Sequence, residues 1–281
     1  MSRSPSPENA RGHSHPAGDP NAPTCLPPIH LEIFVISLRE DQHRREEMRR
    51  QFSPIYDEFK IIDGLRLSDK HSLPDVHGQQ TYDPTLTTAE LGCALSHVKA
   101  LEQFLQSSAT HALILEDDVI GSATDIAEIA NALQELPNDA FLLCGGQDGL
   151  RGEAYNYGKP TIIKDIFKIP RIARKFYTRA CCYCVTKPAA ARIVAMQKSK
   201  LTLSDTWEHY FNDWGNFFFT KKIAHPTDLA GSNIERERAK NTPQSELSRI
   251  RKDGIRKIIR RFLSKAILRA FPHQLGLVRI E

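Results

Sequence analysis

The chain has 281 residues, of which 40% are hydrophobic and 26% are charged, so it is long enough for one large α/β domain and short for two. It contains no run of about eighteen apolar residues, which excludes an evident membrane span, and its N-terminus lacks the apolar core of a signal peptide. The net charge is +4, but residues 249–271 carry nine Lys or Arg against Asp253 and therefore +8, which leaves −4 on the remainder.

The first half of the chain alternates strand and helix patterns. Residues 1–28 are rich in Pro, Ser, Gly, Asn and His and are expected to be disordered, with one domain over 29–240. The remaining expectations in this half are a buried strand over 30–38, an exposed helix over 39–52, a strand over 56–62 and a long surface loop over 66–87.

The same alternation continues after the loop. Thr87 or Thr88 is expected to cap a helix that ends near Gln106, with Glu90 in the position of a capping box. The following elements are expected to be a strand over 112–115, a helix over 125–136, a strand over 140–144, an irregular region over 147–175, a strand over 180–185 and a helix from 186 onward. This order predicts an α/β fold with a mostly parallel sheet, helices on both faces, and ligands at the carboxyl ends of the strands.

The six cysteines do not form a disulfide pattern. Their positions are Cys25, Cys93, Cys144, Cys181, Cys182 and Cys184. Because no second Cys or His pair stands at zinc spacing, residues 181–184 are interpreted as small side chains of a buried strand. Reduced thiols are expected, and with them a cytoplasmic location.

The most specific local feature is an acidic triplet, Glu116-Asp117-Asp118, directly after the apolar strand. Three adjacent carboxylates repel one another unless a cation neutralises them, and Mg²⁺ or Mn²⁺ prefers such oxygen ligands. A solvated acidic turn is the alternative for this triplet when it is considered alone.

Four blocks in the same order resemble glycosyltransferase family 25, the lipooligosaccharide-biosynthesis transferases and their collagen-modifying relatives. The blocks are Val35–Leu38 with Arg44-Arg45, Phe59–Gly64, Glu90–His97 and Leu113–Asp118. The resemblance covers roughly residues 30–235. It implies a GT-A-type, Rossmann-like fold, a UDP-hexose donor (galactose or glucose), a divalent metal, and transfer with inversion.

The resemblance also implies roles for individual residues. Asp118, with Asp117, would ligate the metal, and Glu116 or Asp117 would lie near the ribose or the sugar. Ser37, Arg44 and Arg45 match the block that borders the nucleotide, and Glu90, Ser96 and His97 match a block that could contact donor or acceptor hydroxyls. Considered without the resemblance, Arg44 and Arg45 fit an exposed helix face, and His97 fits a structural histidine.

An inverting transfer needs a carboxylate to accept the proton of the acceptor hydroxyl. Asp205 matches an Asp that the family places here, and Glu208 is the competing candidate. Trp207 and Trp214 could stack on a sugar, although packing in the core is the default expectation. The segment from Pro226 to Ile234 resembles the family's final block, but Asn233 stands where Asp is usual.

Residues 249–271 predict a basic amphipathic C-terminal helix. Its apolar positions, from Ile255 to Ala270, recur at helical spacing and are flanked by Lys and Arg. Such a helix is typical of attachment to an anionic membrane surface. The alternative is a helix docked on its own domain, with its basic face in water. On the membrane interpretation, removal of 249–281 should leave activity on a soluble acceptor largely intact.

These features together predict a metal-dependent transferase that adds a hexose to a lipid-linked LPS-type glycan on the inner face of a bacterial inner membrane. The competing hypotheses are a transferase-like protein that binds nucleotide or glycan without turnover, and a nucleotidyltransferase. The lack of a Gly-rich phosphate loop disfavours the latter. No nucleic-acid-binding module is visible, so nucleic acid is not an expected partner.

Overall fold

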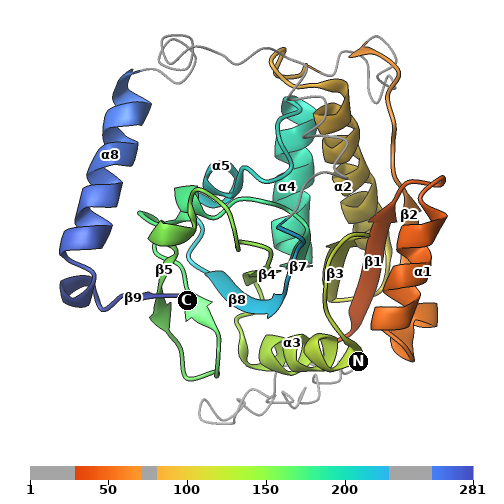
Figure 1. Ribbon diagram of the computed structural model, residues 1–281, viewed down its shortest axis with the longest axis horizontal. Coiled ribbons are helices and arrows are strands. Elements are labelled where there is room, and N and C mark those ends of the chain that lie inside the picture. The colour runs from red at the N-terminus through yellow and green to blue at the C-terminus, as the bar shows by residue number, and fades with distance from the viewer. Residues whose placement is uncertain (1–28, 71–80, 228–254, 281) are drawn as a thin grey trace, which may run out of the picture.

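One nine-stranded sheet runs through the part of the chain that the structure describes, residues 29–70, 81–227 and 255–280 (Figure 1). The structure is a computed structural model. The predicted disorder of 1–28, the middle of the 66–87 loop, the start of the basic C-terminal segment and Asn233 lie outside these residues.

The sheet has the strand order β2-β1-β3-β7-β4-β8-β6-β5-β9. The strands are β1 (Leu31–Ser37), β2 (Lys60–Asp63), β3 (His111–Glu116), β4 (Phe141–Gly145), β5 (Tyr157–Pro160), β6 (Phe167–Lys168), β7 (Cys182–Thr186), β8 (Phe217–Ile223) and β9 (Val278–Arg279). β1 runs parallel to β2 and β3, and β4 runs parallel to β8. β7 is antiparallel to both of its neighbours, β3 and β4. The predicted α/β fold is confirmed, with a sheet that is parallel in its first part and mixed overall.

Helices cover both faces of the sheet, as the alternation predicts. They are α1 (Gln42–Gln51), α2 (Thr88–Gln106), α3 (Ala123–Glu135), α4 (Lys187–Ser199), α5 (Trp207–Phe211) and α8 (Ile255–Ala270). α2, α4 and α5 share one buried cluster with strand residues such as Ile114 and Tyr183. α1 and α3 share the other cluster with the alternate strand residues, such as Leu115 and Cys182. The central strands β3, β4 and β7 therefore bury both faces, which explains their nearly continuous apolar sequences.

The start of α2 is fixed by two local features. The Thr87 hydroxyl accepts a hydrogen bond from the Glu90 N–H (3.1 Å), and the Glu90 carboxylate accepts one from the Thr87 N–H (2.8 Å), which is the predicted capping box. One turn in, a Cβ on Gly92 would lie 2.3 Å from the Leu65 carbonyl oxygen. Glycine thus allows the segment after β2 to pass directly against the helix.

Two predictions about the core are confirmed. Cys144, Cys181, Cys182 and Cys184 are buried free thiols that pack against α3 and β8. Trp207 is 1% exposed and packs among aromatic side chains, so the core interpretation holds for it and stacking on a sugar is excluded. Trp214 is partly buried against the same cluster and donates its indole N–H to the Asp139 carbonyl at 2.7 Å.

The region from 147 to 175 and the end of the chain contain strands that periodicity does not predict. β5 and β6 form a short hairpin, β6 pairs with β8, and β9 pairs with β5. β8 carries the aromatic run Phe217-Phe218-Phe219, which is typical of a strand. The chain end is thereby built into the sheet, and Leu268, Leu277 and Ile280 join its core.

α8 docks on the domain by a face that the sequence does not predict. Ser264 and Leu268 are buried, whereas Phe262, Leu263 and other apolar side chains are exposed. The docked-helix alternative is therefore right that α8 packs on its own domain, but the basic face is not left to water, because Lys265 and Arg269 lie over the Tyr155 ring. Among the described residues, no helix is long and apolar enough to cross a membrane.

Candidate active site

The acidic triplet lies at the carboxyl end of β3, at the edge of the sheet where it was predicted. The Glu116 N–H donates to the Cys181 carbonyl (2.8 Å) and so ends the pairing of β3 with the segment before β7. Asp117 is 8% exposed, and the side chains of Glu116 and Asp118 are about one quarter exposed. The triplet is a partly buried acidic corner and not a solvated turn.

Two arginines of α1 hold this corner. Arg44 Nη1 lies 3.0 Å from Asp117 Oδ1 and 3.3 Å from Asp118 Oδ2. Arg45 donates to the Ser37 hydroxyl (3.0 Å) and to Asp63 Oδ1 (3.0 Å) and thereby ties the ends of β1 and β2 together. The exposed-face alternative is therefore wrong for both arginines, because each is directed to the carboxyl ends of the strands.

His225 reaches the acidic corner from the end of β8 and was absent from the candidates that the sequence suggested. Ala224 and Ile120 exchange two backbone hydrogen bonds of 2.9 Å, which places His225 beside Asp118. His225 Nε2 lies 3.3 Å from Asp118 Oδ1. The signal for it was the position of a histidine directly after an apolar, aromatic strand.

A glycine at the end of β4 makes this approach possible. Gly145 has φ +150°, and a Cβ there would lie 1.7 Å from the Ile223 carbonyl oxygen. Any side chain would push the end of β8, and with it His225, away from β4. The register shift of β4 against β8 falls at the same point.

The corner has the ligand atoms of a divalent-cation site. One atom each from Glu116, Asp118 and His225 lies within 4.8 Å of the others. His225 Nδ1 lies 2.8 Å from the Pro226 carbonyl, which only accepts hydrogen bonds, so Nδ1 carries a proton, and Nε2 would offer a lone pair to a cation after releasing its own proton. Among the described residues, the buried Asp118 Oδ1 accepts no hydrogen bond. A cation fits this oxygen and the imidazole lone pair.

The pKa values agree with a site that is prepared for positive charge. Burial would raise the pKa of Asp118, but His225 and Arg44 outweigh burial and lower it. Burial would lower the pKa of His225, but the attraction of Asp118 outweighs burial and raises it. Burial raises the pKa of Asp117 despite its contacts with Ser37 and Arg44. Asp118 is therefore the most strongly anionic member of the aspartate pair.

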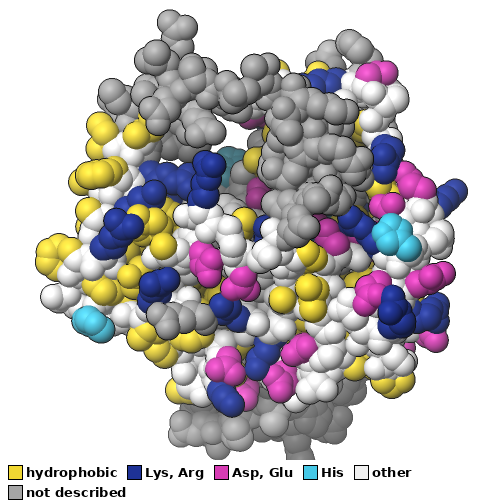
Figure 2. All heavy atoms as spheres, in the orientation of Figure 1, with side chains coloured by type: hydrophobic (Ala, Val, Ile, Leu, Met, Phe, Trp, Pro, Cys, Tyr) yellow, Lys and Arg dark blue, Asp and Glu magenta, His cyan; other side chains and the backbone are white. Residues whose placement is uncertain are grey.

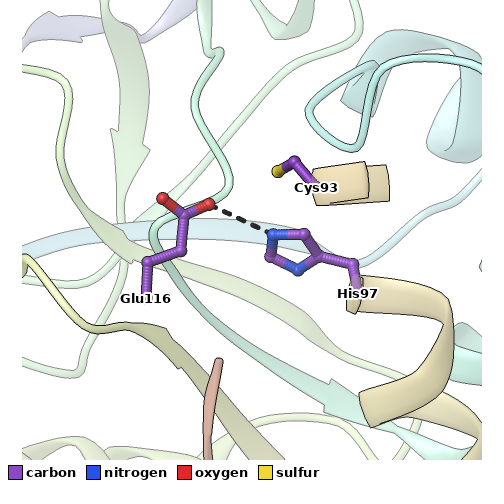
Figure 3. A group of neighbouring side chains, drawn as sticks. All are labelled: Cys93, His97 and Glu116. Carbon is purple, nitrogen blue, oxygen red and sulfur yellow. Dashed lines mark hydrogen bonds and ion pairs between the residues drawn. The ribbon is translucent and has the colours of Figure 1, made fainter. Parts of the chain in front are cut away.

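His97 of α2 forms a hydrogen bond with Glu116 (Figure 3). Its Nε2 lies 3.1 Å from Glu116 Oε1 and its Nδ1 lies 3.0 Å from the Tyr183 hydroxyl. If Nε2–H donates to the carboxylate, Nδ1 accepts from the tyrosine, and both ring nitrogens are used. Cys93, one turn earlier on α2, points to the same place. The arrangement fixes the orientation of Glu116.

Two other predicted residues of α2 are engaged within the fold. The Ser96 hydroxyl donates to the Gly92 carbonyl (2.7 Å) and accepts from the Leu65 N–H (2.8 Å). Glu90 is buried and takes part in the capping box. The structure thus gives Ser96 and Glu90 positions in which they shape the start of α2.

The two candidate bases point to different places. Asp205 Oδ2 accepts the backbone N–H of Arg179 (2.9 Å). Cys93, whose sulfur lies within 4.8 Å of a Glu116 oxygen, is also 3.5 Å from the hydroxyl of Ser204, the residue before Asp205. The Glu208 carboxylate instead lies 3.7 Å from Lys175 and 3.2 Å from Arg260 of α8.

Comparison with known proteins finds partial sequence matches to named glycosyltransferases. Similar proteins include procollagen galactosyltransferase 1-B of Xenopus laevis (26% identical over 97 residues) and a glycosyltransferase 25 family member of Drosophila melanogaster (35% over 96 residues). Each match covers 31% of this chain and only 16% of the relative's length.

One solved structure, described as a mannose-1-phosphate geranyltransferase from Thermus thermophilus, is 15% identical over 75% of this chain and 64% of its own. Its TM-score of 0.28 is too low to support any argument about the site. The model of a single family, described as glycosyltransferase family 25 (LPS biosynthesis protein), matches residues 30–206, well over half of the chain. The chain therefore belongs to glycosyltransferase family 25.

Proposed function

We propose that the chain transfers a hexose from a UDP-sugar to a glycan acceptor and that a divalent cation, Mn²⁺ or Mg²⁺, serves the reaction. The observation that supports this most strongly is the cluster of Glu116, Asp118 and His225 at the carboxyl end of β3. Its position agrees with the rule that ligands of α/β sheets bind beyond the carboxyl ends of strands.

Asp118 Oδ1 and His225 Nε2 would hold the cation, with Glu116 as a third ligand. A cation bound there would neutralise the negative charge that develops on the departing diphosphate. Arg44 pairs with both Asp117 and Asp118, which offsets part of the repulsion between the two carboxylates. Glu116, oriented by His97, completes the site on the side of α2.

Asp205 is the proposed general base. The attacking acceptor oxygen would form a bond to the anomeric carbon as the bond to UDP breaks, and its proton would pass to the Asp205 carboxylate. The Arg179 N–H donates a hydrogen bond to Asp205 Oδ2 and so orients this carboxylate. Attack opposite to the leaving group inverts the anomeric centre. Glu208 is the weaker candidate because it forms ion pairs with Lys175 and Arg260.

The names of similar proteins and the family description favour a particular sugar and acceptor. Similar proteins that are named galactosyltransferases favour UDP-galactose over UDP-glucose as donor. The family description, LPS biosynthesis protein, favours a lipid-linked glycan acceptor at the inner face of a bacterial inner membrane. The relatives named above are animal proteins, so a collagen-type peptide is the comparison acceptor.

A donor screen tests the proposed function. UDP release from UDP-galactose, UDP-glucose and their N-acetyl forms is measured with Mn²⁺ and with excess chelator, with and without acceptor. One donor should be turned over only with metal, and Asp118→Asn should abolish this turnover. Asp57→Asn, at a carboxylate whose side chain is 76% exposed, is the matched control and should not affect it. Full turnover in chelator would refute metal dependence, and binding without any turnover would favour the inactive, transferase-like alternative.

A further inference from the structure

The outer side of α8 is an apolar surface that no described residue covers. Its side chains are 37–71% exposed, and they belong to Ile258, Ile259, Phe262, Leu263, Ile267 and Phe271. Figure 2 shows apolar side chains gathered along this edge of the molecule, over α8. Large exposed apolar side chains that are contiguous mark an interaction surface rather than ordinary surface variation.

The domain holds α8 in the orientation that keeps this surface outward. Leu268 is fully buried, and the Ser264 hydroxyl accepts a hydrogen bond from Lys175 Nζ (3.0 Å). Lys265 and Arg269 each place their charge 4.8 Å from the centre of the Tyr155 ring. Cations of the helix therefore pack on aromatic side chains of the domain, which leaves the apolar side chains to solvent.

Positive charge surrounds the apolar surface. A groove of about 550 Å³ lies between α8 and residues 171–175 and is lined by Arg171, Lys175 and Arg260 together with apolar side chains of α8. Glu208 is the carboxylate that pairs with two of these cations, so positive charge remains in excess. Among the α8 cations whose side chains are described, Arg260 lines this groove, while Arg261, Lys265 and Arg269 lie over aromatic rings of the domain.

We propose that the exposed apolar face of α8 and the cationic groove beside it form a docking surface for an anionic lipid bilayer. A bilayer offers both requirements, an apolar interior for Ile259 and Phe262 and anionic headgroups for the arginines and lysines around them. Symmetric pairing of two copies through this face would instead bring two basic helices together, which opposes self-association.

Vesicle co-sedimentation of the full chain tests this proposal, with phosphatidylcholine vesicles compared with vesicles that also contain phosphatidylglycerol. The wild-type chain should bind the anionic vesicles, less tightly as salt increases. The double variant Ile259→Ser/Phe262→Ser should bind at least about tenfold more weakly, because two inserted side chains are lost. Ile162→Ser, at an isoleucine that is 98% exposed beside the β5–β6 hairpin, is the matched control and should bind as the wild type does.

Three results would overturn the proposal. They are absence of vesicle binding by the wild-type chain, equal binding by the double variant, and a dimer in sedimentation equilibrium that the double variant dissociates. The last result would assign the surface to a second copy of the chain. The assay needs neither donor nor cation, so its failure is distinguishable from failure of the proposed transferase activity.

Discussion

At the scale of residues, the fold brings His225 to carboxylates that lie more than 100 residues earlier in the sequence. Glu116 and Asp118 are neighbours in sequence, but a cation ligand set requires a third group from another direction. β8 supplies that group across the end of the sheet, and the Pro226 carbonyl fixes which ring nitrogen faces Asp118. The sequence predicts the carboxylates because they follow an apolar strand, whereas the histidine depends on the pairing of β8 with β4, which periodicity alone does not specify.

The first prediction concerns this ligand. His225→Ala should weaken Mn²⁺ binding at least about tenfold, because Asp118 loses its partner on the other side of the cation. Binding is measured by calorimetric titration in the absence of donor. His209→Ala, at an exposed histidine of α5, is the control and should bind as the wild type does. Equal affinities of His225→Ala and the wild type would remove His225 from the site.

A second prediction concerns the role of His97 as a positioning residue for Glu116. His97→Leu should weaken Mn²⁺ binding by about 10–100-fold, because the outer hydrogen bond of a ligand is lost. His97→Gln keeps an N–H that can reach Glu116 and should retain most of the affinity. Thermal melting of both variants separates this effect from loss of folding, since His97 is only 3% exposed. If the leucine and glutamine variants have the same affinity, the orienting role is wrong.

A third prediction separates the two candidate bases. Asp205→Asn should lower kcat by about 10²–10⁴, the usual contribution of general-base catalysis, with little change in donor binding. Glu208→Gln should change kcat no more than a few-fold, because its carboxylate faces Lys175 and Arg260. Kinetics with saturating donor and acceptor give the comparison, and the reverse ranking would assign the base to Glu208.

At the scale of elements, the strands and helices before residue 145 follow the sequence closely, except that Ile55–Glu58 form a 3-10 helix and β2 begins only at Lys60, within the strand expected over 56–62. Apolar runs give β1, β3 and β4, and the Thr87–Glu90 pair gives the start of α2. The direction of β7 could not be predicted, because strand patterns carry no information about which neighbours a strand inserts between. The buried face of α8 was also not predictable, because its apolar stripe points outward and its cations pack on Tyr155 and Phe176.

The fourth prediction follows from the way the chain end is built into the sheet. Leu268→Ala should lower the free energy of unfolding by about 2–5 kcal/mol, the cost of a cavity at a fully buried leucine. Leu263→Ala, on the exposed side of the same helix, should change it by no more than about 0.5 kcal/mol. Chemical denaturation of both variants measures the difference.

The same packing bears on the expectation that removal of residues 249–281 leaves activity on a soluble acceptor largely intact. Their deletion would take away β9, Leu268, Leu277 and Ile280, so the truncated domain should be destabilised. Equal stability of Leu268→Ala and Leu263→Ala would show instead that α8 is a separable appendage.

At the scale of the whole molecule, the sheet separates two surfaces with different chemistry. The parallel part, β2-β1-β3, ends in the acidic corner, and the far edge, β6-β5-β9, carries the chain end and α8 (Figure 1). α5 and the residues before it contact both sides: Asp205 accepts the Arg179 N–H, and Glu208 pairs with Arg260 of α8. A transferase with this arrangement could keep its donor site in place while α8 contacts a lipid surface.

The central claim is that Asp118 and His225 hold the cation that serves the donor diphosphate. Anomalous diffraction at the manganese edge, from crystals grown with Mn²⁺ and UDP, tests it most directly. A manganese peak should lie about 2.0–2.3 Å from a carboxylate oxygen of Asp118 and from His225 Nε2, in contact with the diphosphate. Crystals with bound UDP but with manganese elsewhere, or without any manganese beside Asp118, would show that Asp118 and His225 do not hold the cation.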